Sequence, residues 1–259
     1  MSGPVETLPI LTYHSISNEP GPTSIAPETF RAQMEAIVEA GVDVVSLDEV
    51  ENWIAGSRSL ERRAVAITFD DAFRDFSDAA FPILDRLGFR ATVFVPTAAV
   101  GGVENWTGAN DNARRLMSWE EISALARKGV AFGSHTRTHA DLTALSEAAL
   151  DEELIASRQE LERRLGKPAP HFAPPYGRSN PAVRAAIARR YSLSVGVRLD
   201  AARRSSPICD LPRIEMFYYR DISRWRAFLS GRGGAYLQVR RAARGLREML
   251  SGASRRDPY

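Results

Sequence analysis

Residues 64–71 read AVAITFDD, and the rest of the chain is organised around this stretch. Apolar and β-branched residues continue from Ala64 to Phe69, a pattern typical of a buried parallel strand that presents functional groups at its carboxyl end. Asp70 and Asp71 follow directly. Two adjacent carboxylates repel each other unless a cation, a metal ion or a shared proton lies between them. The stretch therefore predicts that the chemistry of the protein is located at these two aspartates.

A second apolar strand, residues 130–134, is followed by His135 and His139. One carboxylate and two histidines from neighbouring strand ends provide three ligands and an open position, which is the arrangement of catalytic zinc. Two histidines four residues apart say little alone, since surface histidines also occur at this spacing. Here, however, half of the four histidines of the chain lie in one five-residue stretch directly after a strand. We therefore expect a site for one divalent metal ion, with zinc favoured.

Length and composition favour a single α/β barrel. The chain has 259 residues, of which 44% are hydrophobic and 25% are charged, as in ordinary globular proteins. It has no run of eighteen apolar residues, and its N-terminus lacks the pattern of a secretion signal, so we expect a cytoplasmic protein. The only cysteine, Cys209, rules out an internal disulfide and a metal site built from cysteines.

Strand and helix patterns alternate along the chain. Several of the expected helices end at a glycine, as at Gly41, Gly88 and Gly166. The alternation favours a parallel barrel or a doubly wound sheet with functional groups at the carboxyl ends of the strands. The expected strands are 8–14, 42–47, 64–69, 91–95, 130–134, 171–173, 193–197 and 211–214.

The positive charge is concentrated at the C-terminal end. Residues 223–259 hold nine arginines and two acidic residues, a net charge of +7, which leaves −5 for residues 1–222 because the whole chain carries +2. We expect residues 1–222 to form the barrel domain. Residues 223–259 are expected to form a basic helical tail that packs on the barrel or extends from it.

Part of this tail has the pattern of a basic amphipathic helix. Such a helix either packs its apolar stripe on the barrel or lies on an anionic membrane surface, so we expect peripheral membrane contact as one alternative. No nucleic-acid binding is expected, because aromatic residues are not interleaved with the arginines and the body of the chain is acidic. The stripe consists of Val239, Ala242, Ala243, Leu246 and Leu250.

Three motifs carry a resemblance to a known family. They are TFDD at 68–71, SHTRTH at 134–139 and PPYG at 174–177. In this order and at these intervals they resemble the metal-dependent polysaccharide deacetylases that share the chitooligosaccharide deacetylase homology domain. The resemblance covers roughly residues 8–215. It implies a distorted (β/α) barrel of about seven parallel strands and removal of an N-acetyl or O-acetyl group from a sugar or glycan.

The resemblance also implies roles for five residues. Asp71, His135 and His139 correspond to the metal ligands, Asp70 to the general base, and Tyr176 to a residue that offers its backbone N–H to the oxyanion. The chemistry agrees with this division, because a divalent metal activates water and polarises a carbonyl group. An ionised aspartate beside the metal can accept the proton of that water.

Two positions depart from the family pattern. The third motif usually carries an arginine that orients the base, but this position is Ala173. The last motif usually supplies a histidine as general acid, but the corresponding strand reads LPRIEMF. Arg213 can replace the arginine and His14 can be the acid, with His171 as a second candidate acid. The alternatives are a surface ion pair for Arg213 and a hydrogen-bonded rim position for His14.

The sequence therefore predicts a deacetylase of N-acetylated sugars or glycan intermediates. Two alternatives stay open. The same fold can act as an amidase on a small amide that is not a sugar. It can also be a carbohydrate-binding barrel that has lost its general acid.

Overall fold

The computed structural model describes residues 5–106 and 113–250, with side chains described up to residue 245. The strands are β1 Thr7–Leu8, β2 Ile10–Tyr13, β3 Asp43–Val45, β4 Ala64–Phe69, β5 Thr92–Val95, β6 Ala131–Ser134, β7 His171–Phe172, β8 Leu193–Leu199, β9 Ala202–Arg203 and β10 Leu211–Glu215. The α-helices are α1 Pro27–Glu39, α2 Leu47–Ile54, α3 Phe81–Leu87, α4 Trp119–Arg127, α5 Glu147–Leu165, α6 Pro181–Ala188, α7 Ile222–Leu229 and α8 Gly234–Leu250.

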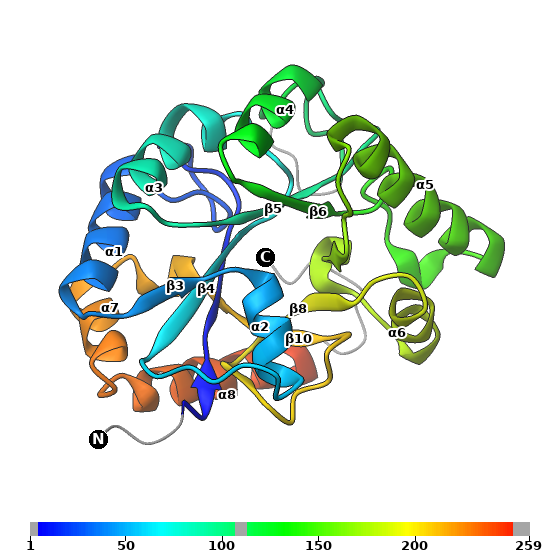
Figure 1. Cartoon of the computed structure of the whole chain (residues 1–259). Coiled ribbons are helices and arrows are strands. Elements are labelled where there is room, and N and C mark those ends of the chain that lie inside the picture. Colours follow the sequence, from blue (N-terminus) through cyan, green and yellow to red (C-terminus); the bar gives the residue numbers. More distant parts are fainter. Residues whose placement is uncertain (1–4, 107–112, 251–259) are drawn as a thin grey trace.

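Seven parallel strands form a closed ring surrounded by helices (Figure 1). The order around the ring is β2, β10, β8, β7, β6, β5 and β4, and the ring closes where β4 pairs with β2. Strand β3 pairs with β4 outside this ring, also in parallel. The expected distorted barrel of about seven parallel strands is confirmed.

The alternation of side chains along β4 determines what reaches the interior. Val65, Ile67 and Phe69 pack in one apolar cluster with residues of the surrounding helices, while Ala64 and Ala66 belong to the cluster inside the barrel. Successive side chains of a strand point to opposite faces. The next residues on the interior face are therefore Thr68 and Asp70, which places a carboxylate at the carboxyl end of the barrel.

Helix α2 closes the amino end of the barrel. Its Val50 and Trp53 pack in the interior cluster with Ala64, Leu193 and Leu211, which are the first residues of their strands. In Figure 1, α2 lies across the middle of the strands. The helix begins at a capping box in which Ser46 and Glu49 bond each other's backbone N–H groups. Packing thus closes the amino end of the barrel, and Asp70 lies at the carboxyl end.

The two C-terminal helices contact the barrel layer differently. In α7, Trp225 is fully buried and donates its indole N–H to the carbonyl of Gln33 in α1, at 3.0 Å. In α8, Leu237 is buried, but Val239 is 64% exposed. The division of the chain at residue 222 stays a prediction, and residues 251–259 of the expected tail lie outside the described residues.

The expected apolar stripe of α8 faces solvent over the part that can be followed. Ala242 and Ala243 are exposed along with Val239, whereas the side chains of Leu246 and Leu250 lie outside the described set. The barrel therefore does not cover the described half of the stripe. None of the helices within residues 5–106 and 113–250 is long and apolar enough to cross a membrane.

Candidate metal centre

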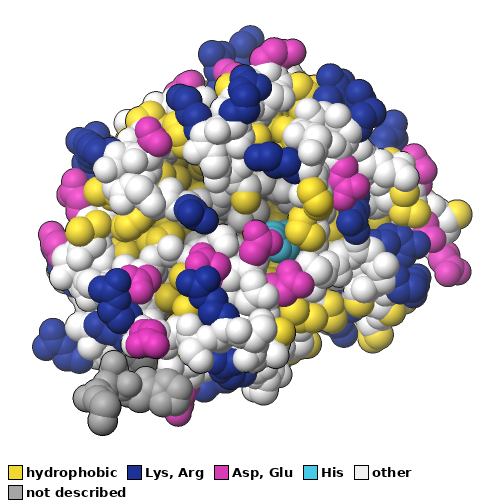
Figure 2. All heavy atoms as spheres, in the orientation of Figure 1, with side chains coloured by type: hydrophobic (Ala, Val, Ile, Leu, Met, Phe, Trp, Pro, Cys, Tyr) yellow, Lys and Arg dark blue, Asp and Glu magenta, His cyan; other side chains and the backbone are white. Residues whose placement is uncertain are grey.

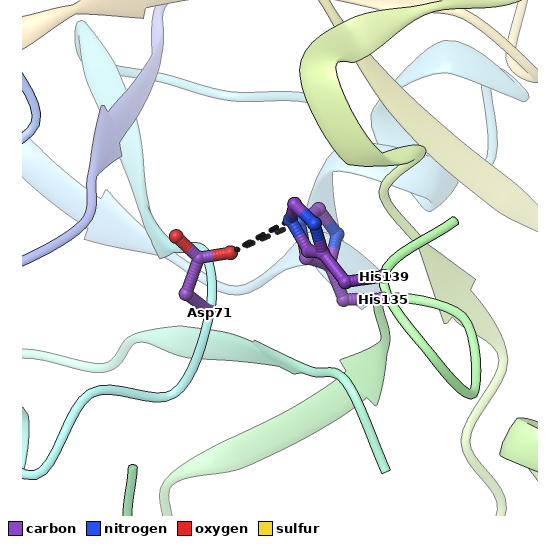
Figure 3. A group of neighbouring side chains, drawn as sticks. All are labelled: Asp71, His135 and His139. Atoms are coloured by element: carbon purple, nitrogen blue, oxygen red, sulfur yellow. Dashed lines mark ion pairs between the residues drawn. The ribbon is translucent and has the colours of Figure 1, made fainter. Parts of the chain in front are cut away.

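Asp71, His135 and His139 converge just beyond the carboxyl ends of β4 and β6. Oδ1 of Asp71 lies 3.3 Å from Nε2 of His135 and 3.2 Å from Nε2 of His139, and no side chain of the three is more than 6% exposed. Figure 3 shows both imidazole rings directed at the same carboxylate oxygen. Two ligand atoms at about 2.0–2.1 Å from a tetrahedral zinc ion lie about 3.4 Å apart. The two spacings from Asp71 are therefore those of donors to one ion, and all three ligand atoms lie within 4.8 Å of one another.

The surroundings of these side chains also suit a metal ion. Nδ1 of His135 lies 2.7 Å from the carbonyl oxygen of Ala173, so that nitrogen carries the proton and Nε2 is left with a lone pair. Oδ1 of Asp71 is buried without a hydrogen bond from any described residue. Burial alone would raise the pKa of Asp71, but hydrogen bonds and positive charge from the two histidines in their protonated forms outweigh it and hold that pKa well below its ordinary value. The residues present fit a divalent cation.

Asp70 is held by Arg213 in a two-pronged ion pair inside the barrel. Nη1 and Nη2 of the guanidinium each lie 2.7 Å from one carboxylate oxygen, and both side chains are at most 4% exposed. Nε of Arg213 donates to the carbonyl of Gly196 at 2.8 Å. Burial by itself would raise the pKa of Asp70, but Arg213 outweighs it and lowers that pKa. Arg213 thus lies in the interior rather than on the surface.

The two other histidines occupy opposite ends of the barrel. His14 follows β2, is 7% exposed, and has Asp70, Asp71 and Arg213 among its neighbouring charges. Burial is the largest influence on His14 and lowers its pKa. His171 begins β7 at the amino end, where its charged neighbours are two acidic residues of α2. The structure brings His14 to the aspartates and leaves His171 away from them.

Aromatic side chains surround His139 on the outer side. Trp106 stacks on its ring with centroids 4.1 Å apart, and Tyr176 meets the same ring edge-on at 4.8 Å. A cavity of about 410 Å³ opens here. It is lined by Asn105, Trp106, Thr138, His139, Ala140, Asp141, Tyr176 and Arg178.

The segment between the two metal-site histidines is fixed by Glu153 of α5. Its carboxylate accepts hydrogen bonds from the backbone N–H groups of Arg137 and Thr138, at 2.8 and 2.9 Å, and from the Thr138 hydroxyl at 2.7 Å. Sequence reasoning missed this residue. The available signal was a glutamate among the leucines of the inward face of α5, because a buried carboxylate needs several donors.

Backbone strain is concentrated at the same place. Within the described part of the chain, five residues other than glycine have a positive φ, and all of them lie in the three motifs or directly after one. Such conformations are rare for residues with a side chain and persist only when the surrounding structure enforces them. They are Asp71, Ala72, Thr136, His139 and Tyr176.

Comparison with families of known proteins gives one consistent result. A family model described as polysaccharide deacetylase matches residues 57–194, just over half of the chain. YxkH of Bacillus subtilis, assigned to the polysaccharide deacetylases, is 26% identical over 210 residues, covering 81% of this chain and 71% of its own. Poly-β-1,6-N-acetyl-D-glucosamine N-deacetylase of Escherichia coli K12 is 26% identical over 135 residues, which are 49% of this chain and only 20% of that protein.

Solved structures agree with these sequence matches. The Streptococcus pyogenes deacetylase PplD, determined in complex with acetate, has a TM-score of 0.71 and 26% identity, covering 82% of this chain and 92% of its own. IcaB of Ammonifex degensii also has a TM-score of 0.71, at 24% identity, over 86% of this chain and 98% of its own. The likeness to IcaB shows the shared fold.

We expect His135→Ala to bind one fewer equivalent of zinc per chain than the unchanged protein, because two remaining ligands cannot hold an ion in an open site. Elemental analysis of dialysed, untagged protein measures this difference. His14→Ala serves as the control, since His14 is near the aspartates without being in the ligand set. An unchanged zinc content in His135→Ala would remove this histidine from the ligands.

Proposed function

The chain belongs to the polysaccharide deacetylase family, and we propose that it is a metal-dependent hydrolase that removes acetyl groups from an N-acetylated sugar or glycan. The observation that carries this proposal is the pair of neighbouring aspartates with separate partners. Asp71 lies beside the imidazoles of His135 and His139, which bind metal ions in their neutral form, and Asp70 is paired with the guanidinium of Arg213. One carboxylate is therefore suited to bind a cation and the other to accept a proton.

Asp71, His135 and His139 would hold the divalent ion, and one carboxylate with two imidazoles matches zinc best. When bound, such an ion polarises the scissile carbonyl group and activates water as the nucleophile. The hydrogen bond from His135 to the carbonyl of Ala173 keeps the imidazole in the orientation and tautomer that binding needs.

Asp70 would act as the general base. Its lowered pKa keeps the carboxylate ionised at neutral pH, and each oxygen retains a lone pair beside its bond to Arg213. A carboxylate held by two charge-assisted bonds loses little freedom when it accepts a proton from the attacking water. Arg213 supplies from β10 the orienting charge that the family usually places at the position of Ala173.

His14 would protonate the leaving amine. Its imidazole lies among the charges of Asp70 and Asp71, and the lowered pKa means that it carries no stored proton at neutral pH. The proton taken up by Asp70 is therefore the source, with a ring nitrogen of His14 passing it to the amine nitrogen as the C–N bond breaks. Tyr176 would offer its backbone N–H to the oxyanion.

The cavity beside His139 favours a sugar over a small amide that is not a sugar. Trp106 and Tyr176 provide flat faces for the C–H side of a sugar ring, and Asn105, Asp141 and Arg178 provide polar groups for its hydroxyls. The relative from Escherichia coli is named for a polymer of N-acetylglucosamine. Release of acetate from N-acetylglucosamine oligomers, compared with release from a simple aryl acetamide, separates the two substrate classes. Turnover of neither would favour the carbohydrate-binding alternative.

We also propose that α8 contacts an anionic membrane surface from one side. The described part of its apolar stripe is exposed. Two arginines follow Val239 directly in the helix: the guanidinium of Arg240 lies over the ring of Tyr218, and Arg241 is paired with Asp200. An exposed apolar stripe flanked by arginines is the pattern of helices that lie in the membrane interface. The net charge of +7 on residues 223–259 gives attraction to anionic lipid, at about 1 kcal/mol for each arginine near the surface.

Asp70→Asn should keep the bound ion and lower kcat on the order of 100-fold or more, because the amide cannot accept a proton. Acetate release and ion content are measured on the same samples. Asp71→Asn is the matched change at the neighbouring residue and should lose ion and activity together. Near-normal turnover of Asp70→Asn would mean that Asp70 only orients its neighbours.

His14→Ala should reduce hydrolysis of acetamides much more than hydrolysis of activated aryl acetates, whose leaving groups need no proton. The ratio of the two kcat/KM values, relative to the same ratio for the unchanged protein, is the measurement. Equal losses on both substrates would argue against His14 as the proton donor.

Val239→Asp should weaken sedimentation with anionic vesicles roughly tenfold, because a charge replaces an apolar contact of about 1.5 kcal/mol. Val38→Asp makes the same change at another exposed valine, on α1, and should bind vesicles normally. Vesicles of neutral lipid alone should not bind the protein. If Val239→Asp instead turns a dimer into a monomer in light scattering, a second copy of the chain covers the stripe.

A further inference from the structure

A second group of metal-binding side chains lies at the amino end of the barrel, where the proposed reaction uses no residue. His171 comes from the first position of β7, and Asp48 and Glu51 come from one face of α2. Nε2 of His171 lies 3.3 Å from Oδ1 of Asp48 and 3.6 Å from Oε2 of Glu51. On the face that α2 covers, Figure 2 shows a histidine between acidic side chains.

The buried imidazole of His171 favours a bound cation at this place. Its side chain is only 5% exposed, and Nε2 has no hydrogen-bond partner among the described residues. The two carboxylate oxygens lie at distances beyond a well-formed N–H···O bond. A buried nitrogen of this kind is rare, because polar atoms removed from water are normally bonded. A cation between the nitrogen and the two carboxylates would bond all three.

A simple ion pair explains the group less well. An ion pair would place an N–H of His171 on one of the carboxylates, but Nε2 lies 3.3 and 3.6 Å from the two oxygens and forms no hydrogen bond within the described residues. A neutral imidazole with its lone pair on Nε2 fits this geometry, and that is the form that binds metals.

The two carboxylates are arranged as ligands would be. Asp48 and Glu51 are three residues apart on α2, so both project from the same side of the helix. Glu51 is 31% exposed and accepts a hydrogen bond from the Ser192 hydroxyl at 2.8 Å, which orients its carboxylate. Asp48 is 70% exposed and free to rotate toward the nitrogen. The ligand atoms already lie within 4.8 Å of one another.

We propose that Asp48, Glu51 and His171 form a second divalent-cation site at the closed end of the barrel. One imidazole and two carboxylates suit zinc or manganese, with water in the remaining positions. An ion here would join α2 to β7. That strand leads directly to Ala173, whose carbonyl holds His135. The site is therefore structural, and it supports the position of a histidine in the metal centre at the other end.

The test removes the site at Asp71, so that zinc binding by the second site can be measured alone. Untagged His135→Ala is titrated with zinc alone by calorimetry, and its melting temperature is followed. We expect one bound equivalent and a rise in melting temperature. His135→Ala combined with His171→Gln should show neither. In the otherwise unchanged protein, His171→Gln should lower the zinc content from two equivalents to one.

Glu51→Gln keeps the test decisive if His171→Gln fails to fold, because Glu51 is partly exposed. In the His135→Ala background it should weaken zinc binding tenfold or more. Glu35→Gln, the same change on a solvent-facing carboxylate of α1, should leave binding unchanged. The proposal is overturned if His135→Ala binds no zinc, or if Glu51→Gln and His171→Gln bind it normally. Either result leaves the proposed deacetylase activity untouched.

Discussion

The structure depends on keeping two buried, adjacent carboxylates charged. Asp70 and Asp71 have separate partners, a guanidinium for the first and two imidazoles for the second, so neither carboxylate depends on the group that holds its neighbour. A strand would direct their side chains to opposite faces, but the positive φ of Asp71 turns the chain just beyond β4. Both carboxylates therefore stay at the mouth of the barrel. Arg213 reaches one from β10, and the two histidines reach the other from the end of β6.

The energetic cost of this arrangement is met by the rest of the fold. Among the described residues, positive φ in residues other than glycine is confined to the three motifs and the residue after the first of them, whereas the strands and outer helices around them share an apolar core. Glu153 holds the segment between His135 and His139 from the side of α5, with three hydrogen bonds to a single carboxylate. Strain of this kind persists only where surrounding contacts outweigh it. The barrel supplies those contacts, and the loops gain a fixed geometry.

The sequence was informative wherever local pattern determines position. The apolar run before Asp70 predicted the central strand, and the spacing of His135 and His139 predicted their convergence on Asp71. What it could not supply was the order of strands around the ring. Arg213 reaches Asp70 because β10 lies between β8 and β2, a contact across 143 residues. His171 looked like a site residue, but it begins its strand instead of ending it. Helical spacing predicted α8 without showing which face would pack.

Helix α2, which lies across the amino end, limits the routes by which molecules can reach and leave the site. Buried side chains such as Ile10, Ala66, Phe94 and Val195 fill the ring above α2, so the described residues block the barrel at this end. In the proposed reaction, substrate, water and both products would therefore pass through the end of the barrel where the cavity beside His139 opens. Acetate would form beside Asp71, His135 and His139 and would leave past the glycan that released it. At an entrance shared in this way, the small product and the next acetyl group would compete for the same space.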